Sequence, residues 1–350
     1  MTKVLVTGVG GRIGSSLTQH LLHDGYDVRG MVRPDGRRPD REIARDIEIV
    51  EAWLTDTEAL GQAVAGTDMV VHLAAQMGIG DTDPERYFDI NVGGTLRLLE
   101  AAVNQRPPVR RFVFTSTDNT YGPAYPQAQP ITEESRQVPG DYYGTSKVLA
   151  ERLVQNYHKL YGLEYTILRL GSVVAPNEAT ALFRHTWTRA FLAAHYAAGR
   201  RSNLWPLLAN QGDPTLLLDT AVGSRDDNPA IVLTGPDKMP WSLHLTDVRD
   251  AVTGIVLGME RDAAANDEFN IIGPNTTTCD DAAAAIARHD SQAEAVTVQM
   301  PVKLAFELSI AKARRTLGYT PAWDFEGMLS TALDRDVRSQ PRDYVPVGAA

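Results

Sequence analysis

A single cysteine, Cys279, occurs among the 350 residues, so the chain cannot form an internal disulfide. The first residues run into a strand pattern without a charged leader or cleavage site, which with the lone cysteine predicts a reducing, cytoplasmic location. No apolar run approaches the roughly 20 residues that a membrane-spanning helix needs. Basic residues are in the minority, 34 against 44 acidic residues with a net charge of −10, which argues against partners such as nucleic acid or an anionic membrane.

Several patterns of reactive side chains are missing as well. No cluster of His, Cys and Asp has metal-ligand spacing, so no metal site is predicted. Neither a Gly-x-Ser-x-Gly elbow nor the two-carboxylate layout of a glycosidase stands out. What remains is an ordinary globular composition, 43% hydrophobic and 22% charged, in a chain long enough for about two domains or one large α/β domain.

Strand and helix patterns alternate along the first half of the chain. Short β-branched apolar runs predict strands, and apolar residues at helical spacing predict the helices between them. We expect strands at residues 3–7, 27–33, 47–51, 69–73, 111–116 and 165–170, and helices at 13–22, 56–65, 84–105 and 142–161. Such alternation predicts a parallel sheet covered by helices on both faces.

The alternation weakens after residue 171. The segment 200–228 mixes Pro, Gly and Asp with leucine runs that fit neither period, so we expect loops and short helices there. Further strands are expected at 231–234 and 268–272, and further helices at 246–260, 279–289, 303–317 and 325–334. The last residues, 339–350, are rich in Pro, Gly and Ala, which predicts a loosely held tail.

Three glycines lie between the first expected strand and the first helix. Gly8, Gly11 and Gly14 have the spacing at which one glycine permits a tight turn, the next lets the backbone approach a pyrophosphate, and the third allows close helix–strand packing. The helix that begins after them offers unpaired N–H groups to phosphates. The turn therefore predicts a site for a dinucleotide cofactor.

The residues after the second strand bear on which nicotinamide cofactor binds. An acidic side chain there would bond the ribose 2′-hydroxyl, whereas a basic one would accept a 2′-phosphate. Val32 stands where the acid would be and Arg33 follows it, with Arg37 and Arg38 close behind and Arg12 in the glycine turn. These arginines favour NADP, although a basic cluster on a loop is more often a set of solvated charges.

Tyr143 and Lys147 are four residues apart in the helix expected at 142–161, so their side chains share one face. A lysine ammonium beside a phenol stabilises the phenolate, lowers its pKa and lets it exchange a proton nearer neutral pH. The same lysine can hold ribose hydroxyls. Such a pair also arises by chance on helix surfaces, and its place after the fifth strand is what favours a catalytic pair.

Further motifs follow in order along the chain. They are His72-Leu73-Ala74-Ala75, Asn91-Val92-Gly93-Gly94-Thr95, Thr115-Ser116-Thr117 before Tyr121-Gly122, Ser242-Leu243-His244-Leu245-Thr246-Asp247-Val248 and Phe269-Asn270-Ile271-Ile272-Gly273-Pro274. With the glycine turn and the Tyr-Lys pair, they make nearly the whole chain resemble an extended short-chain dehydrogenase/reductase of the epimerase/dehydratase group, which acts mainly on nucleotide sugars. The resemblance implies the α/β class, with a Rossmann-type doubly wound parallel sheet and a smaller C-terminal α/β lobe for the substrate.

The resemblance also implies roles for single residues. Thr117 takes the position that hydrogen-bonds the substrate oxygen, Tyr143 exchanges the proton and Lys147 tunes Tyr143, with Asp118 as a candidate acid. The alternative for Thr117 is a hydroxyl that caps a helix or turn. The residues implied at the cofactor are Gly8, Gly11, Arg12, Ile13, Gly14, Arg33, Leu54, Leu73, Ala74, Ala75, Asn91, Thr115, Tyr143, Lys147, Ser172 and Val173.

Two positions depart from the family pattern. Asn119 stands where the sugar 4,6-dehydratases carry a glutamate, and since an amide cannot accept a proton at neutral pH, the base for eliminating water is missing although Asp118 remains. Dehydration is therefore not expected, and neither is the chemistry of the decarboxylating members, which keep that glutamate. Trp53 replaces an aspartate that often contacts adenine, and it either stacks on the base or packs against the protein.

The segment 183–201, in the part of the chain expected to bind the substrate, is less informative. Its basic and aromatic residues either hold a diphosphate and a base or lie on the solvated side of a helix. These residues are Arg184, His185, Trp187, Arg189 and Arg200.

Together these features predict how the chain is divided and what it does. Residues 1–175 would form an NAD(P)-binding Rossmann domain that also receives part of 228–262, residues 176–340 an intercalated substrate lobe, and 341–350 a loose tail. The expected protein is an NAD(P)-dependent epimerase or oxidoreductase acting on a sugar or nucleotide sugar, with epimerisation by transient oxidation as the leading case. The alternatives are an NADPH-dependent ketone or alcohol reductase and a non-catalytic cofactor-binding regulator. By resemblance we also expect a homodimer formed through the helices at 84–105 and 142–161.

Overall fold

Seven parallel strands form the central sheet. The computed structural model describes residues 1–78, 82–125, 128–225, 227–334 and 343–347. The strands lie in the order β11-β6-β5-β4-β1-β2-β3, and every neighbouring pair is parallel. Their bounds are β1 Lys3–Thr7, β2 Asp27–Val32, β3 Glu48–Glu51, β4 Met69–His72, β5 Arg111–Thr117, β6 Glu164–Leu170 and β11 Asp267–Ile271. The predicted parallel sheet is confirmed.

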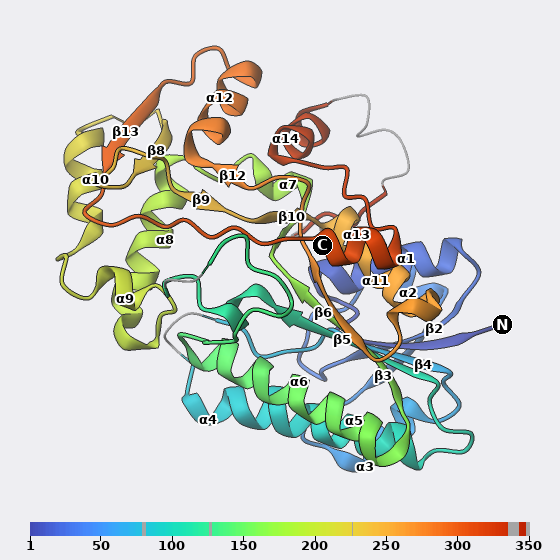
Figure 1. Cartoon of the computed structure of the whole chain (residues 1–350). Helices are drawn as coiled ribbons and strands as arrows, with labels where there is room; N and C mark the ends of the chain where they lie inside the picture. Colours follow the sequence, from blue (N-terminus) through green and yellow to red (C-terminus); the bar gives the residue numbers. More distant parts are fainter. Residues whose placement is uncertain (79–81, 126–127, 226, 335–342, 348–350) are drawn as a thin grey trace.

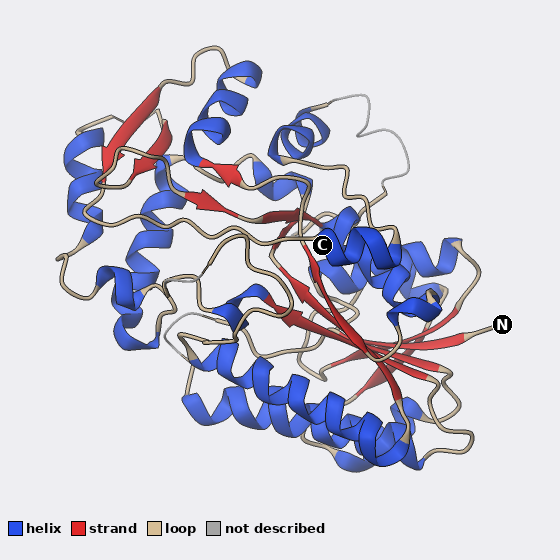
Figure 2. Cartoon of the chain, viewed as in Figure 1, coloured by secondary structure: helices blue, strands red, loops and turns tan. Residues whose placement is uncertain are grey.

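Helices cover both faces of this sheet (Figures 1 and 2). One face packs against α3 Thr57–Val64, α5 Gly94–Asn104 and α6 Tyr142–Tyr161, and the other against α1 Arg12–His23, α11 Val248–Glu260 and α13 Ala311–Leu317. In β1, Val4 and Val6 belong to the core under α1 and α11, whereas Leu5 belongs to the core under α5 and α6. Because both faces are buried, the strand has an unbroken apolar run in the sequence.

A second hydrophobic core lies beyond the carboxyl ends of the strands, at the upper left of Figure 1. It is built from α8 His185–Ala198, α10 Pro214–Val222, α12 Cys279–His289, α14 Phe325–Leu333 and the parallel pair β8 Ala230–Thr234 and β13 Ala295–Gln299. Two further pairs lie between the cores, β7 Ser172–Val174 with β10 Leu245–Asp247 and β9 Ser242–Leu243 with β12 Thr277–Thr278. The remaining helices are α2 Arg41–Arg45, α4 Pro84–Tyr87, α7 Pro176–Ala179 and α9 Trp205–Leu208.

The prediction of a helix at 303–317 is wrong for the first half of that segment, since α13 begins only at Ala311. Leu304, Phe306, Leu308 and Ile310 are buried while the residues between them are more exposed, a period of two that indicates extended chain. This segment runs beside Ile131, whose backbone N–H donates to Glu307 O at 2.8 Å. A long-range partner therefore decides its conformation.

Three other expectations for the C-terminal part need correction. β11 is an edge strand of the central sheet, so residues 267–271 lie outside the substrate lobe expected for 176–340. β13 was not predicted, because only Val298 of its residues is buried and the apolar pattern is weak. In the described part of the tail, Tyr344 and Val345 are buried and Val345 N donates to Ser16 Oγ at 3.0 Å, so these residues are not loose. Residues 341–342 and 348–350 lie outside the described residues.

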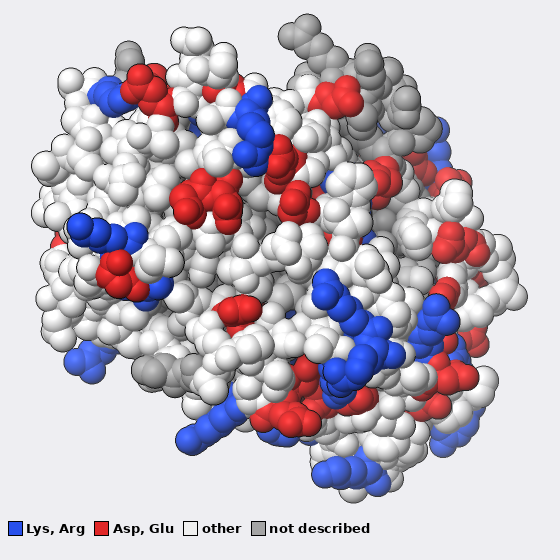
Figure 3. All heavy atoms as spheres, turned by 45° about the horizontal axis from the view of Figure 1, so that its top comes forward, with Lys and Arg blue, Asp and Glu red and all other residues white. Residues whose placement is uncertain are grey.

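No helix in the described ranges combines the length and the apolar composition that crossing a bilayer requires. Basic and acidic side chains stand beside one another on the face shown in Figure 3, with uncharged surface between them.

Candidate active site

A cavity of about 1090 Å³ lies where the carboxyl ends of β1, β4, β5 and β6 meet the second core. The strand order reverses between β1 and β4, the place where open α/β sheets bind ligands. Most of the residues implied by the sequence line it. They are Gly8, Gly11, Arg12, Ile13, Arg33, Leu54, Leu73, Ala74, Ala75, Thr115, Thr117, Asp118, Tyr143, Lys147, Ser172 and Val173.

The glycine turn has the close packing that its spacing predicts. Gly8 has a φ of +73°, and a Cβ on Gly14 would lie 2.2 Å from the Gly8 carbonyl oxygen. Gly14 therefore serves helix–strand packing and does not line the cavity. A Cβ on Gly10 would lie 1.9 Å from the Arg37 carbonyl oxygen, so this glycine is also required. The backbones of Gly8, Gly10 and Gly11 form the cavity wall beside the first turn of α1, and this bare cradle fits the pyrophosphate of a dinucleotide.

The loop after β4 is held by Thr7. Its Oγ1 accepts hydrogen bonds from the backbone N–H groups of Leu73 and Ala74, both at 3.1 Å, and lies 2.8 Å from Nδ1 of His72. Burial lowers the pKa of His72 to about 3, so the ring is neutral, and its Nε2 lies 3.1 Å from Thr95 Oγ1. Thr7 thus positions Leu73 and Ala74, which line the cavity.

Asn91 has a different place from the one that the resemblance implies. It lies in the π-helical segment Phe88–Gly93, is buried, and does not line the cavity. Its Oδ1 accepts from Gln76 N at 2.7 Å, and its Nδ2 donates to Gln76 O at 3.0 Å and Ser146 Oγ at 2.9 Å. Ser146 in turn donates to the carbonyl oxygen of Tyr143 at 2.7 Å. Asn91 therefore connects the loop after β4 to the helix of Tyr143 and acts as a positioning residue.

The arginines near the glycine turn are already engaged. Arg12 is paired with Glu178 of α7 through two hydrogen bonds of 2.6 Å. The Arg33 guanidinium carbon lies 5.7 Å from the centre of the Trp53 ring, and its Nε lies 3.5 Å from Asp35. Arg33 and Trp53 both line the cavity, so the tryptophan is part of the same wall.

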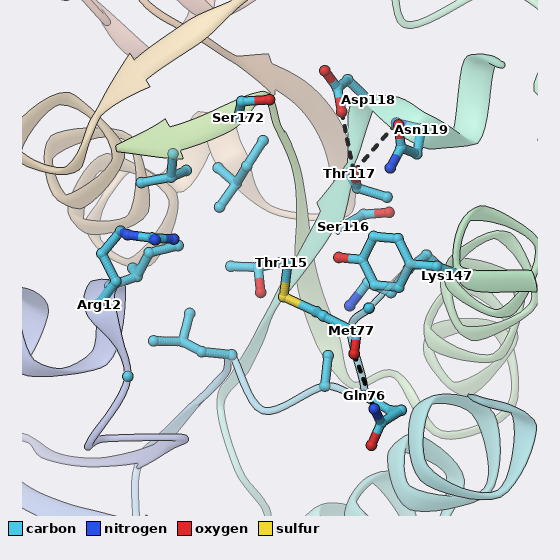
Figure 4. Close-up of a pocket in the computed structure, with 18 of the residues that line it drawn as sticks. Arg12, Gln76, Met77, Thr115, Ser116, Thr117, Asp118, Asn119, Lys147 and Ser172 are labelled. Carbon is cyan, nitrogen blue, oxygen red and sulfur yellow. Dashed lines mark hydrogen bonds between the residues drawn. The ribbon is translucent and has the colours of Figure 1, made fainter. Parts of the chain in front are cut away.

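Thr117 ends β5 and opens the 3₁₀ turn Asp118–Tyr121. Its Oγ1 donates to Asp118 Oδ1 at 3.1 Å and accepts from Asn119 N at 3.2 Å, so it does cap a turn as well as line the cavity. Figure 4 shows Thr117, Asp118 and Asn119 together on this strand end, with Lys147 beside them and Arg12 across the cavity. Burial raises the pKa of Asp118 to about 7, against the opposing effect of the Thr117 hydrogen bond.

Tyr143 and Lys147 both line the cavity, but their electrostatics differ from the expectation. Burial raises the pKa of Tyr143, and the nearby Asp118 and Asp141 raise it further. Burial also lowers the pKa of Lys147 to about 7, and its Nζ lies 4.2 Å from the centre of the Phe114 ring. The pKa of Tyr143 is therefore raised where a lowering by Lys147 was predicted, because burial is the largest effect on the phenol.

A buried ion pair anchors the helix that carries these two residues. Arg169 of β6 donates to both carboxylate oxygens of Glu151 at 3.1 and 2.8 Å, and to the Tyr121 hydroxyl at 2.8 Å. Glu151 lies one turn after Lys147 and opposes the lowering of its pKa. With all its groups paired, this cluster holds α6 in one position on the sheet.

The opposite wall of the cavity, called here the lobe side, was not assigned to the site from the sequence, although three of its residues, 242–244, belong to a motif quoted above. It consists of Phe191, His195, Asn203, Leu204, Ser242, Leu243, His244, Leu304 and Phe306. The sequence had pointed instead to five basic and aromatic residues between 183 and 201, and none of these lines the cavity. Arg184 pairs with Asp290 at 3.2 Å and Arg189 with Asp219 at 2.8 Å. Within the described part of the chain, no group of three or more His, Cys, Asp or Glu side chains is placed to hold a metal.

The family model described as the NAD dependent epimerase/dehydratase family matches residues 4–271. A UDP-glucose 4-epimerase of Rhizobium leguminosarum bv. trifolii is 35% identical over 170 residues, which are 47% of this chain and 50% of that protein. A UDP-glucose 4-epimerase of Streptomyces lividans is 32% identical over 206 residues, 57% and 61% of the two chains. The aligned part of this chain thus spans about half the length of the curated relatives that it matches.

Solved structures share the fold over almost the whole chain. A short-chain dehydrogenase/reductase superfamily protein from Agrobacterium tumefaciens with bound NAD has a TM-score of 0.79 and 29% identity, covering 94% of this chain and 95% of its own. The UDP-glucose 4-epimerase of Thermotoga maritima with UDP-glucose has a TM-score of 0.70 and 23% identity, covering 96% and 98%. The residues matched by the family model include the glycine turn, Thr117, Tyr143 and Lys147, which the fold assembles in one cavity, and the chain belongs to the NAD-dependent epimerase/dehydratase family.

Proposed function

We propose that the protein is an NAD(P)-dependent epimerase or oxidoreductase that acts on an alcohol or carbonyl carbon of a sugar or related substrate. The supporting observation is that Thr117, Tyr143 and Lys147 line the same cavity as the glycine turn. When bound, the dinucleotide supplies the hydride acceptor or donor. The second core and its elements serve as the substrate lobe.

The roles of the three residues follow from their hydrogen-bonding capacity. The hydroxyl of Thr117 holds the reacting oxygen of the substrate. Tyr143 is protonated at neutral pH because its pKa is raised, so in the direction of reduction its hydroxyl donates a proton to the substrate carbonyl oxygen. Lys147 faces the phenolate that remains, and its ammonium form stabilises that charge. In the direction of oxidation the proton returns to Tyr143.

Asn119 restricts which reactions the site performs. Its side chain lies directly after Asp118 and accepts a hydrogen bond from Asn203 Nδ2 at 2.8 Å through Oδ1. An amide in this position supplies no base for removing a carbon-bound proton. The proposal is accordingly limited to oxidation, reduction and epimerisation, without elimination of water.

The cofactor of this family is NAD, and the Agrobacterium neighbour holds NAD. We propose that the Arg33 guanidinium also binds the 2′-phosphate of NADP. The affinity for NADP would then equal or exceed the affinity for NAD. The guanidinium lies over Trp53 in the cavity wall, at the end of β2 where the adenosine ribose is recognised in this fold. Both side chains then contact the same end of the cofactor.

A homodimer is proposed from the outer face of α6. Tyr142, Leu149 and Leu160 are exposed on that helix at intervals of seven and eleven residues, which places them on one stripe. α5 packs beside α6 on the same side of the sheet, as Figure 1 shows. An apolar stripe of this kind is suited to a partner helix.

The proposed reaction is tested with Tyr143→Phe, which keeps the ring and removes the hydroxyl. We expect turnover to fall by about 10²- to 10⁴-fold while the affinity for NADH, measured by fluorescence titration, stays unchanged. Tyr142→Phe on the same helix is the matched control and keeps full turnover. Equal turnover in wild type and Tyr143→Phe would overturn the proposed function and favour a non-catalytic cofactor-binding protein.

A further inference from the structure

We propose that the substrate is an uncharged hydroxy or carbonyl compound without a phosphate group, and that the lobe side does not bind a nucleoside diphosphate. This inference rests on the proposed function and narrows its substrate class. It follows from the charges, the apolar walls and the hydrogen-bonding groups of the lobe side.

The lobe side carries no cation among the residues that the structure describes there. It has no lysine or arginine, and its two histidines are neutral at pH 7 because burial lowers the pKa of His195 and of His244 to about 4. His244 Nε2 accepts from the backbone N–H of Leu308 at 2.8 Å, which also requires the neutral ring. The ionisable groups of Asp118, Asp141 and Lys147 also line the cavity, but they do not belong to the lobe side.

A nucleoside diphosphate would bring about two negative charges into this space. Removing phosphate oxygens from water is costly unless cations or several N–H donors replace the water. The lobe side offers Phe191, Leu204 and Phe306 as apolar walls instead. The arginines that line the cavity, Arg12, Arg33 and Arg37, lie at the glycine-turn end and not on the lobe side.

The basic residues of the substrate region are used elsewhere. Arg184 and Arg189 form ion pairs with Asp290 and Asp219 outside the cavity. Arg201 lines a small pocket of about 10 Å³, which shares Asp141 and Tyr143 with the large cavity. None of Arg184, Arg189 and Arg201 lines the large cavity itself.

The polar groups on the lobe side suit neutral oxygens. Asn203 Nδ2 donates to Asn119 Oδ1, which leaves Asn119 Nδ2 as a donor and Asn203 Oδ1 as an acceptor without partners among the described residues. His195 Nδ1 lies 2.7 Å from Ser202 Oγ, and its Nε2 likewise has no described partner. One amide donor, one amide acceptor and one neutral imidazole nitrogen match hydroxyl or carbonyl groups on the substrate.

Binding of UDP to the NAD-loaded protein tests this inference by calorimetry. The bound NAD occupies the glycine-turn end, so UDP can report only on the remaining part of the cavity. We expect no saturable heat up to about 1 mM UDP. A Kd below about 100 μM would overturn the inference, and loss of that binding in Arg201→Ala would identify Arg201 as the missing cation.

Turnover gives a second readout. With D-glucose, D-galactose, 1-phenylethanol and UDP-glucose as probes, we expect the highest kcat/KM for one of the three uncharged compounds, and a highest value for UDP-glucose would overturn the inference. With that uncharged compound, Asn203→Ala is expected to raise KM about tenfold, while Asn104→Ala on the surface of α5 leaves it unchanged. Tyr143→Phe distinguishes the proposed function from the proposed substrate class. If turnover of the uncharged compound survives this change, the catalytic role of Tyr143 is refuted and the substrate class is not.

Discussion

Arg12 in the glycine turn and Glu178 in α7 form an ion pair with two contacts. Arg12 Nε lies 2.6 Å from Glu178 Oε2, and Nη2 lies 2.6 Å from Oε1. Glu178 Oε2 also accepts from the backbone N–H of Ala175 at 2.9 Å. The pair connects the turn at the start of the central sheet with the chain that leaves β7, so it ties the cofactor end of the cavity to the second core.

A double-mutant cycle measures how much this pair stabilises the fold. Because both side chains are partly exposed, solvent screens the attraction, and we expect a coupling free energy of about 1 kcal/mol between Arg12→Ala and Glu178→Ala in urea denaturation. The exposed pair Arg189 and Asp219 has similar geometry and serves as the control, with a smaller expected coupling. Equal couplings would show that the partial burial of the Arg12 pair contributes nothing.

Removing Asn91 breaks the connection between the loop after β4 and the helix of Tyr143. Asn91→Ala leaves the backbone groups of Gln76 without their partner, and we expect the free energy of unfolding to fall by about 2–3 kcal/mol. The KM for the cofactor should also rise, because the loop that carries Leu73 and Ala74 lines the cavity. Asn104→Ala, an exposed asparagine on α5, is the control for both measurements, and an unchanged KM in Asn91→Ala would contradict the positioning role.

Asp118 makes the free energy of unfolding depend on pH. Its pKa is raised to about 7 in the folded protein and is about 3.9 in an unfolded chain. Between pH 4 and 7 the folded state holds a proton that the unfolded state has lost, so the free energy of unfolding contributed by this group decreases as the pH rises.

Asp118→Asn removes this titration. The stability of the variant relative to wild type should therefore increase from pH 4 to pH 7, as measured by urea denaturation across that range. A difference between Asp118→Asn and wild type that stays constant across this range would show that the pKa of Asp118 is not raised.

Arg33→Ala tests the choice between the two nicotinamide cofactors. We expect the Kd for NADPH to rise about 10- to 100-fold, since a charge-assisted contact with the 2′-phosphate is lost, while the Kd for NADH changes little. Fluorescence titration of both cofactors gives the two constants. Arg38→Ala is the control, because Arg38 pairs with Glu51, and equal losses for NADH and NADPH in Arg33→Ala would refute a 2′-phosphate contact.

Charged side chains on the exposed apolar stripe of α6 should dissociate the proposed homodimer into single chains. Leu149→Asp with Leu160→Asp places two carboxylates on the apolar stripe, and light scattering should then give the mass of one chain where wild type gives two. Leu216→Asp changes an equally exposed leucine on α10 and should leave the mass of two chains. A wild-type mass of one chain would refute the dimer outright.

The sequence by itself determined the order of strands and helices in the first half of the chain and the place of the cofactor cradle. Both depend on neighbours in sequence: the alternation of apolar residues sets the period of an element, and the glycines after β1 permit a turn that no other residue allows. For that reason the expected helix at 142–161 and the strand at 3–7 agree with α6 and β1 to the residue.

Only the tertiary structure decided the lobe side of the cavity, the extended path of residues 303–310 and the charge states of Tyr143 and Lys147. Asn119 and Asn203 are 84 positions apart, and no local pattern connects them. Desolvation depends on everything packed around a side chain, so the helical spacing that brought Tyr143 and Lys147 onto one face could not show that burial raises the pKa of Tyr143 and lowers that of Lys147. Contacts between distant segments and exclusion of water arise only when the chain folds, so no local pattern in the sequence could show them.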